Sequence, residues 1–370
     1  MEQDFPQSPL GVYFHIPFCL SKCHYCSFYS VPFTQEKLKL YLELLTGEID
    51  NYLEAYPWLK DADTLYFGGG TPSLLKGGQL KSLIERFSHA PEAEISLEVN
   101  PLQITGSFMS DLKDTGVNRL SLGLQSLNDA ELIWLERRHK ASQIPDKIRL
   151  LRDHGFENFS LDLIYGLPNA TLQGLDDNLS RYIELKPKHI STYLLTLDDQ
   201  EMIGDDERDE LHARMYELIR DRLCSAGYGQ YEISNFALPG YESRHNLHYW
   251  RSDDYLGLGA SASGFIRGQR YQNPADMEGY ESQVRGKTLI PDPEPETRLP
   301  DDFLMMGLRL LRGVSLAEYR ARFGKDLIRE KSREINKLTD MGLVQVDNEY
   351  ISLSRKALFI SNAVIGELIS

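Results

Sequence analysis

The alternation of short apolar segments with longer amphipathic ones constrains the fold of this chain more than any other feature. Six short segments rich in apolar and β-branched residues predict strands, at residues 11–18, 64–67, 94–99, 119–124, 158–165 and 189–195. Segments with apolar residues at i, i+3 and i+4 predict helices, at residues 34–56, 78–89, 129–138, 171–185 and 209–227. Strands that alternate with helices pair in parallel through right-handed crossovers. The sequence therefore predicts an α/β fold with a parallel sheet curved into a full or partial barrel.

The composition is that of an ordinary globular protein, with 41% hydrophobic and 26% charged residues among 370. No stretch reaches the length of about 18 apolar residues that a membrane-spanning helix needs, and the first residues are acidic where a signal peptide is basic. We therefore expect a cytoplasmic protein. The 40 basic and 55 acidic side chains give a net charge of −15, which argues against a general nucleic-acid binder.

Polar and turn-forming residues follow the predicted strands. Such residues occupy positions 68–72, 98–101, 123–126 and 162–168. In barrels built from parallel strands, binding and catalytic residues collect at the C-terminal ends of the strands. Gly, Pro, Asn and Ser also favour ordinary turns, so the pattern has a purely structural explanation as well.

The strand and helix pattern changes after about residue 236. Residues 240–300 are rich in Tyr, Gly, Arg and Pro, which indicates a connecting or wrapping segment. Helical periodicity returns at residues 302–311, 315–323 and 329–341, before a hairpin formed by residues 343–346 and 350–353. We therefore predict three domains, at residues 1–237, 238–300 and 301–370, the last a winged-helix-like α+β module. The acidic balance favours a packing or partner-docking role for this module over DNA binding.

Three of the four cysteines, Cys19, Cys23 and Cys26, fall within eight residues, and Cys224 is far from them. Disulfides are rare in a reducing cytosol, and three cysteines cannot pair internally, so a metal or cluster site is favoured. Thiolates from one short loop can hold three irons of a four-iron cubane and leave the fourth open to a ligand with amino and carboxylate groups. A zinc site and three incidental thiols are the alternatives. Cys224 is predicted to be a buried thiol on the helix at residues 209–227.

The sequence Tyr-Phe-His-Ile-Pro-Phe-Cys at residues 13–19, followed by Cys-His-Tyr-Cys at residues 23–26, resembles the cluster loop of the radical S-adenosylmethionine (SAM) superfamily. The resemblance extends from about residue 11 to residue 237 and continues into the C-terminal region. It implies a partial (β/α)6 barrel. It also implies that Cys19, Cys23 and Cys26 hold a 4Fe–4S cluster, whose fourth iron binds the amine and carboxylate of SAM.

The same resemblance implies further SAM-binding residues. Gly69, Gly70 and Thr71 are similar to the turn that receives the SAM amino group, since glycine lets the backbone approach a ligand closely. Glu98 is similar to an acid that contacts the ribose or carboxyl group, with a solvated surface glutamate as the alternative. The other matching positions are Tyr13, Tyr25, Gln125, Arg137 and Asp162. The Arg137 match is open to a shift of one position, because Arg138 follows it, and Tyr25 could instead shield the cluster from water.

The chain is most similar to the branch that contains the oxygen-independent coproporphyrinogen III oxidases, but it departs from the oxidases twice. The oxidases carry a fourth cysteine where this chain has Phe28, and they have a longer segment before the cluster than the 18 residues that precede Cys19. Residues 243–250, Ser-Arg-His-Asn-Leu-His-Tyr-Trp, instead resemble the His-Asn-x-x-Tyr-Trp signature of HemW-type haem chaperones. This resemblance implies a chaperone that binds haem and transfers it to acceptor proteins.

The chaperone interpretation makes His245 the candidate haem ligand, with His248 as the alternative and with Tyr249 and Trp250 packed on the macrocycle. A hydrogen-bonded structural corner is the other role open to this motif. Respiratory acceptor proteins and a peripheral membrane association also remain open. Two other functions remain: oxidative decarboxylation of coproporphyrinogen III, and a regulatory or scaffold role in which the cluster serves only stability. Whether the chain is an enzyme is therefore left open.

Overall fold

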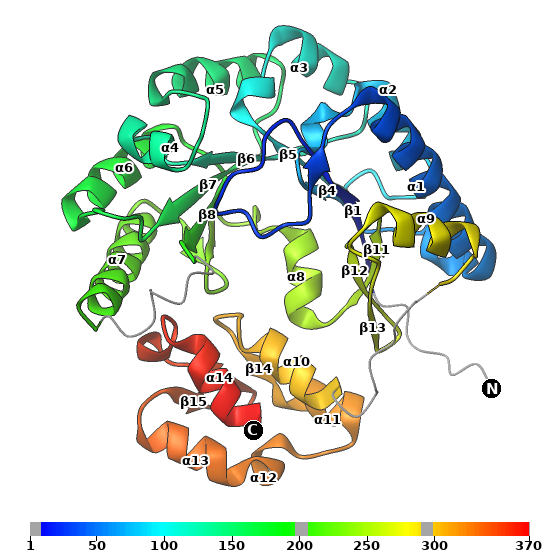
Figure 1. The fold of residues 1–370 in the computed structure, drawn as a ribbon. Coiled ribbons are helices and arrows are strands. Elements are labelled where there is room, and N and C mark those ends of the chain that lie inside the picture. Colours follow the sequence, from blue (N-terminus) through cyan, green and yellow to red (C-terminus); the bar gives the residue numbers. More distant parts are fainter. Residues whose placement is uncertain (1–8, 197–205, 290–298, 370) are drawn as a thin grey trace.

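The computed structural model describes residues 9–196, 206–289 and 299–369, which form a barrel-like unit and a smaller C-terminal unit beneath it (Figure 1). Within these residues, eleven strands form the main sheet, in the order β13-β12-β11-β1-β4-β5-β6-β7-β8-β10-β9. The parallel strands are β11 (Asp254–Leu258), β1 (Leu10–Ile16), β4 (Thr64–Gly69), β5 (Glu94–Val99), β6 (Arg119–Gln125), β7 (Phe159–Tyr165) and β8 (His189–Leu194). All six predicted strands are present, and the predicted partial (β/α)6 barrel is confirmed.

The helices that follow the strands cover the outer face of the curved sheet (Figure 1). They are α1 (Gln35–Ala55), α2 (Gly77–Ile84), α3 (Gly106–Leu112), α4 (Asp129–Trp134), α5 (Ile144–Asp153), α6 (Leu172–Glu184) and α7 (Asp206–Ser225). Threonine side chains cap several of them; Thr34 and Thr171, for example, accept hydrogen bonds from the third residue beyond. Helix α4 ends four residues before its predicted end, because the chain turns at Glu136, which has a φ of 53°.

The outer face of the sheet packs an apolar core against the helices, whereas the inner face is largely polar. Phe14 and Phe67 stack with ring centroids 4.4 Å apart, and Leu45 and Ile49 of α1 are fully buried. Burying a side chain of this size contributes about 1.5–3 kcal/mol. The inward side chains of the strands include tyrosines, carboxylates and an arginine, so the interior of the barrel offers hydrogen-bonding groups.

The segment between the two units adds strands to the main sheet, which its turn-rich composition did not predict. Strand β11 pairs in parallel with β1, and β12 (Ser263–Ile266) and β13 (Gln269–Gln272) extend the sheet beyond it. Strands β9 (Gly229–Gln230) and β10 (Asn235–Ala237) form the other edge. Helices α8 (Arg244–Arg251) and α9 (Met277–Arg285) complete this segment.

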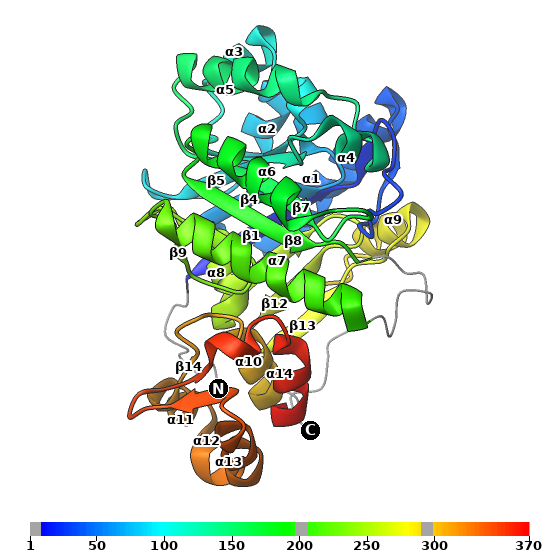
Figure 2. The same ribbon diagram turned by 90° about the vertical axis from the view of Figure 1, so that its left-hand side faces the viewer.

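The C-terminal unit is a small α+β module, as predicted. Its elements are α10 (Leu299–Gly307), β14 (Val314–Ser315), α11 (Leu316–Phe323), α12 (Leu327–Glu330), α13 (Ser332–Asp340), β15 (Val344–Val346), β16 (Tyr350–Leu353) and α14 (Ser361–Ile369). Strands β15 and β16 form the predicted hairpin, and β14 pairs with the other edge of β16. The unit contacts the barrel through Arg355, which pairs with Glu217 and Asp221 of α7, and through a backbone bridge between Leu310 and Glu232 (Figure 2).

The prediction that Cys224 is buried is wrong, because its thiol is exposed. Helix α7 turns Met215, Ile219 and Leu223 toward the core. Cys224 follows Leu223 and therefore points about 100° away from that face. In the described part of the chain, no helix is both long and apolar enough to span a membrane.

Candidate functional site

A cavity of about 520 Å³ opens at the C-terminal ends of the barrel strands. Eleven of the thirteen predicted site residues line it: Cys19, Cys23, Cys26, Tyr25, Gly69, Gly70, Thr71, Glu98, Gln125, Arg137 and Asp162. They come from segments spread over more than 140 residues of sequence, which the parallel strands bring to one edge. Tyr13 and His245 do not line the cavity.

The loop that carries the three cysteines is closed at its base by backbone pairing. Strands β2 (Phe18–Cys19) and β3 (Val31–Pro32) pair in parallel, and the Phe33 amide donates to the Cys19 carbonyl at 3.1 Å. Inside the loop, the Cys26 amide donates to the Cys23 carbonyl at 3.1 Å. This arrangement presents three thiols from one short segment to the cavity.

Two of these thiols have polar neighbours. The Thr71 hydroxyl donates to the Cys19 sulfur at 3.6 Å, and an Arg137 nitrogen lies 3.9 Å from the Cys23 sulfur. Burial raises the pKa of Cys26, and the nearby Cys19 and Cys23 add to the rise. Among the described residues, no three Cys, His, Asp or Glu side chains converge as ligands of a single metal ion do. The ligands of a cubane bind separate irons and need not converge in this way.

Residues at the end of α4 and just after it pack against the cysteine loop. The ring of His24 packs edge-on against Trp134 with centroids 4.7 Å apart, and His24 Nδ1 lies 3.7 Å from a Glu136 oxygen. Tyr25 packs against a separate apolar cluster that includes Leu135, and burial raises its pKa. Tyr25 therefore covers one side of the loop while it also lines the cavity.

Arg137 is the arginine that contacts the cysteine loop. Besides approaching Cys23, its guanidinium donates to the Gly123 carbonyl at 2.6 Å. Arg138 also lines the cavity, but its side chain is exposed. Because the φ of Glu136 is positive, the chain changes direction just before these two arginines, and their side chains point in different directions.

The glycine turn after β4 has no room for side chains. Gly69 has a φ of +106°, and a Cβ atom there would lie 2.6 Å from the His15 ring. A Cβ atom on Gly70 would lie 2.8 Å from the Phe18 carbonyl oxygen. Gly69 and Gly70 themselves line the cavity, so a ligand that binds to backbone groups can approach the main chain of this turn.

Two carboxylates lie inside the barrel at the cavity wall. Glu98 accepts hydrogen bonds from the Tyr66 hydroxyl at 2.9 Å and the Gly69 amide at 3.1 Å. Burial raises the pKa of Glu98 to about 7, with a further contribution from Asp162. Burial also raises the pKa of Asp162 to about 6, and Ser121 donates to it at 3.4 Å. Glu98 is thus half-buried and hydrogen-bonded at the cavity wall, and it is not a solvated surface residue.

Gln125 supplies an acceptor without a partner. It ends β6 with a φ of 68°, where the pairing register between β6 and β7 shifts. Its side-chain oxygen is buried and accepts no hydrogen bond from the described residues. An unpaired buried acceptor costs about 1–3 kcal/mol, so a donor on a bound ligand would be favoured at this position.

Tyr13 lies beneath the cavity wall and not in it. Its hydroxyl lies 3.0 Å from Nδ1 of His15, whose other ring nitrogen lies 3.0 Å from the Tyr29 carbonyl oxygen. A Cβ atom on Gly68 would lie 2.9 Å from the Tyr13 ring. Tyr13 therefore supports the turn after β4 from below.

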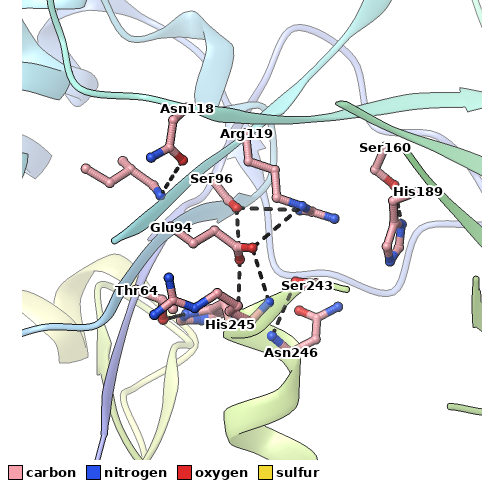
Figure 3. Close-up of polar contacts among 12 residues, drawn as sticks. Thr64, Glu94, Ser96, Asn118, Arg119, Ser160, His189, Ser243, His245 and Asn246 are labelled. Atoms are coloured by element: carbon pink, nitrogen blue, oxygen red, sulfur yellow. Dashed lines mark hydrogen bonds and ion pairs between the residues drawn. The ribbon is translucent and has the colours of Figure 1, made fainter. Parts of the chain in front are cut away.

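His245 is fully buried on α8 with its ring beside Thr64 (Figure 3), and both of its ring nitrogens have partners. Nδ1 lies 2.7 Å from the Thr64 hydroxyl, and Nε2 lies 2.7 Å from the Tyr249 hydroxyl. In this arrangement neither nitrogen is available to a haem iron. These contacts match the alternative role of the motif, a hydrogen-bonded structural corner. The neighbouring His248 is buried as well and pairs with Asp253 at 3.2 Å.

Sequence reasoning missed the polar residues that fill the barrel below the cavity, above all Tyr66 and Arg119. A signal for them exists, since polar residues recur at every second position of the buried strands. The inward positions are Glu94, Ser96 and Glu98 on β5, Arg119 and Ser121 on β6, and Ser160 and Asp162 on β7. Alternation within a strand that is buried on both faces indicates a polar barrel interior.

Comparisons with known proteins agree with this geometry. Residues 13–182 match the radical SAM superfamily, and residues 296–360 match the HemN C-terminal domain. The chain is 32% identical to heme chaperone HemW of Lactococcus lactis subsp. lactis, over 98% of each chain. It is 35% identical to heme chaperone HemW of Escherichia coli, over 88% of this chain and 90% of that protein. The structure of E. coli coproporphyrinogen III oxidase (HemN) matches 99% of this chain and 91% of its own, with a TM-score of 0.80 and 24% identity.

Proposed function

Because this chain belongs to the HemW family of the radical SAM superfamily, we propose that it is a haem chaperone, which binds haem and transfers it to acceptor proteins. The similarity over 98% of both chains to a protein named heme chaperone HemW carries this proposal. Phe28 adds support, because it lines the cavity with 61% of its surface exposed at the position where the oxidases have a fourth cysteine.

We propose that Cys19, Cys23 and Cys26 hold a 4Fe–4S cluster with SAM at its open iron. Thiolates are the ligands that such clusters take, and the Thr71 hydroxyl and the Arg137 guanidinium lie beside the Cys19 and Cys23 sulfurs. When bound, the cluster supplies electron transfer at the open iron.

The rest of the cavity fits a ligand that carries hydroxyl, amino and carboxylate groups. The main chain of Gly69 and Gly70 is open to an amino group, and Glu98 and Asp162 can accept hydrogen bonds from hydroxyl groups. The unpaired oxygen of Gln125 takes a further donor. These contacts orient the ligand, and desolvation raises the pKa of Glu98 to about 7 and that of Asp162 to about 6.

We further propose a cytoplasmic location, because free thiols that bind a cluster persist in a reducing compartment. Haem-accepting proteins are the proposed partners, with respiratory proteins among the candidates. The similarity between this chain and the HemW proteins supports both proposals.

Haem titration and a turnover assay on one anaerobically reconstituted sample test this function. We expect saturable changes in haem absorbance, and no protoporphyrinogen from coproporphyrinogen III in the presence of dithionite and SAM. A protein that fails to bind haem is not a haem chaperone. Rapid formation of protoporphyrinogen would instead establish the oxidase activity, which is the alternative that the fold allows.

SAM binding is expected to strengthen as the pH rises. The pKa of Glu98 is about 7 and that of Asp162 about 6, so both become fully ionised, and better acceptors, only above pH 7. The affinity of the reconstituted protein should rise about tenfold between pH 6 and pH 8, following the ionised fraction of Glu98. Equilibrium dialysis with labelled SAM measures this. The Glu98→Gln variant should lose most of the dependence, and an equally steep profile in that variant would show that another group is responsible.

A further inference from the structure

Helix α8 lies at the end of the barrel opposite the cysteine loop (Figure 2). Its first residues contact the beginnings of strands: the His245 ring contacts Thr64, the first residue of β4, and the His245 amide contacts Glu94, the first residue of β5. The cavity is lined by Gly69 and Glu98, which lie at or near the other ends of the same two strands. Strands β4 and β5 therefore connect the His-Asn-x-x-Tyr-Trp motif on α8, at one end, with the cavity at the other.

The N-terminus of α8 is held by a buried carboxylate (Figure 3). The amides of Arg244 and His245 each donate to Glu94 at 3.1 Å. Glu94 also lies 3.9 Å from the buried guanidinium of Arg119. A carboxylate at a helix N-terminus pairs with unsatisfied amides and with the helix dipole, so the position of α8 is well defined.

The ring of His245 is fixed between two hydroxyl groups, and its face packs against Tyr66. The ring centroids of His245 and Tyr66 are 5.0 Å apart with an angle of 23° between the planes. The Tyr13 ring also stacks on the Tyr66 ring, with the ring centroids 6.1 Å apart and an angle of 28° between the planes. The direction in which Tyr66 points therefore depends on the His245 ring.

Tyr66 connects the His245 ring with the Glu98 carboxylate at the cavity wall. Its hydroxyl donates to Glu98 at 2.9 Å. Gly68 makes the approach possible, because a Cβ atom there would lie 2.9 Å from Tyr13, 3.0 Å from Tyr66 and 3.1 Å from Glu98. A continuous column of contacts thus runs from α8 through Tyr66 to the carboxylate at the cavity wall.

We infer that His245 is a positioning residue for the cavity: it holds the Tyr66 ring so that the Tyr66 hydroxyl fixes the Glu98 carboxylate. This role rests on the proposed function only in taking Glu98 as a SAM contact. It gives the histidine of the motif a task at the SAM site, distinct from ligation of haem iron.

The first test reads Tyr66 directly and needs neither SAM nor haem. With 3-fluorotyrosine at position 66 of the reconstituted full chain, the fluorine NMR shift should titrate with Glu98, with a midpoint near pH 7. His245→Ala should raise the midpoint by about one pH unit, because Glu98 loses a donor that favours its ionised form. His245→Phe keeps a ring against Tyr66 but loses both hydrogen bonds of the ring, so its midpoint should rise less than that of His245→Ala.

An unchanged midpoint in folded His245→Ala would overturn the inference. If that variant does not fold, Thr64→Val releases one of the two hydrogen bonds of the ring at nearly constant volume. We expect a smaller upward shift of the midpoint in Thr64→Val, and no shift would again contradict the role. A merely structural contribution of His245 would lower the melting temperature and leave this midpoint in place.

A double-mutant cycle on SAM affinity provides the second test. Tyr66→Phe and His245→Ala should each weaken SAM binding about tenfold, and the double variant should be no weaker than either single one, since both act through the same hydrogen bond. An additive, hundredfold loss would refute the coupling. The matched control is Arg244→Ala. The side chain of Arg244 is exposed, and this residue contacts Glu94 only through its main-chain amide, which the substitution keeps. The SAM affinity of Arg244→Ala should therefore equal that of the wild type.

Haem titration of His245→Phe separates this inference from the proposed function. If His245 positions Tyr66 and does not bind haem iron, this variant should bind haem as the wild type does and should bind SAM more tightly than His245→Ala. Loss of haem binding with retention of SAM binding would identify His245 as a haem ligand and overturn the inference. If the wild type itself binds no haem, the chaperone function fails, and the fluorine titration still decides the role of His245.

Discussion

Replacing Cys19, Cys23 or Cys26 with alanine is expected to abolish the brown chromophore of the reconstituted protein. A loop of this length supplies three thiolates from one segment, and the loss of one leaves two irons of the cubane without protein ligands. Iron and sulfide content per chain should fall to near background, as should the visible absorbance that gives the reconstituted protein its brown colour. SAM binding should be lost with the cluster.

The matched control is Cys224→Ser. This thiol is exposed on α7, away from the cavity. The variant should therefore retain wild-type iron content and absorbance. Normal cluster formation in Cys23→Ala, or a loss in Cys224→Ser as large as in the loop variants, would show that the ligand assignment is wrong.

Glu94→Ala is expected to cause the largest loss of stability of any single substitution in the barrel interior. It leaves the guanidinium of Arg119, which is only 2% exposed, without its nearest carboxylate. It also leaves the amides of Arg244 and His245 at the N-terminus of α8 without their acceptor. Breaking a buried ion pair in this way costs about 3–5 kcal/mol of unfolding free energy. Urea denaturation followed by circular dichroism measures the change.

Glu92→Ala is the control for this prediction, because Glu92 lies two residues away with its side chain exposed. Its carbonyl oxygen, which accepts from Arg244, is unchanged by the substitution. We expect a change below about 0.5 kcal/mol in this variant. A loss of similar size in both variants would mean that Glu94 contributes no more than any residue of the strand.

The parts of the site that the sequence predicted are those encoded by neighbouring residues. The spacing of Cys19, Cys23 and Cys26 lies within one loop, and Gly69, Gly70 and Glu98 stand at the ends of strands whose apolar pattern is local. Because parallel strands carry their C-terminal ends to the same edge, local patterns were enough to bring these residues to one cavity.

Other features escaped prediction because they depend on which surfaces meet. The exposure of Cys224 is decided by the rotation of α7 against the sheet, which the packing of Leu223 sets. The pairing of β11 with β1 joins segments with unlike sequence patterns, about 240 residues apart, through backbone hydrogen bonds that any side chains allow.

The sequence by itself determined the barrel, the cysteine loop and the family, because periodicity and short motifs are properties of contiguous residues. Only the tertiary structure decided what His245 contacts. Its hydroxyl partner Thr64 is 181 residues away, and the amide of His245 meets Glu94 across 151 residues. A histidine in a short motif has the same composition and spacing whether it binds iron or supports a tyrosine. The groups that the fold places beside its two nitrogens make the difference, and here both are hydroxyl groups of the protein.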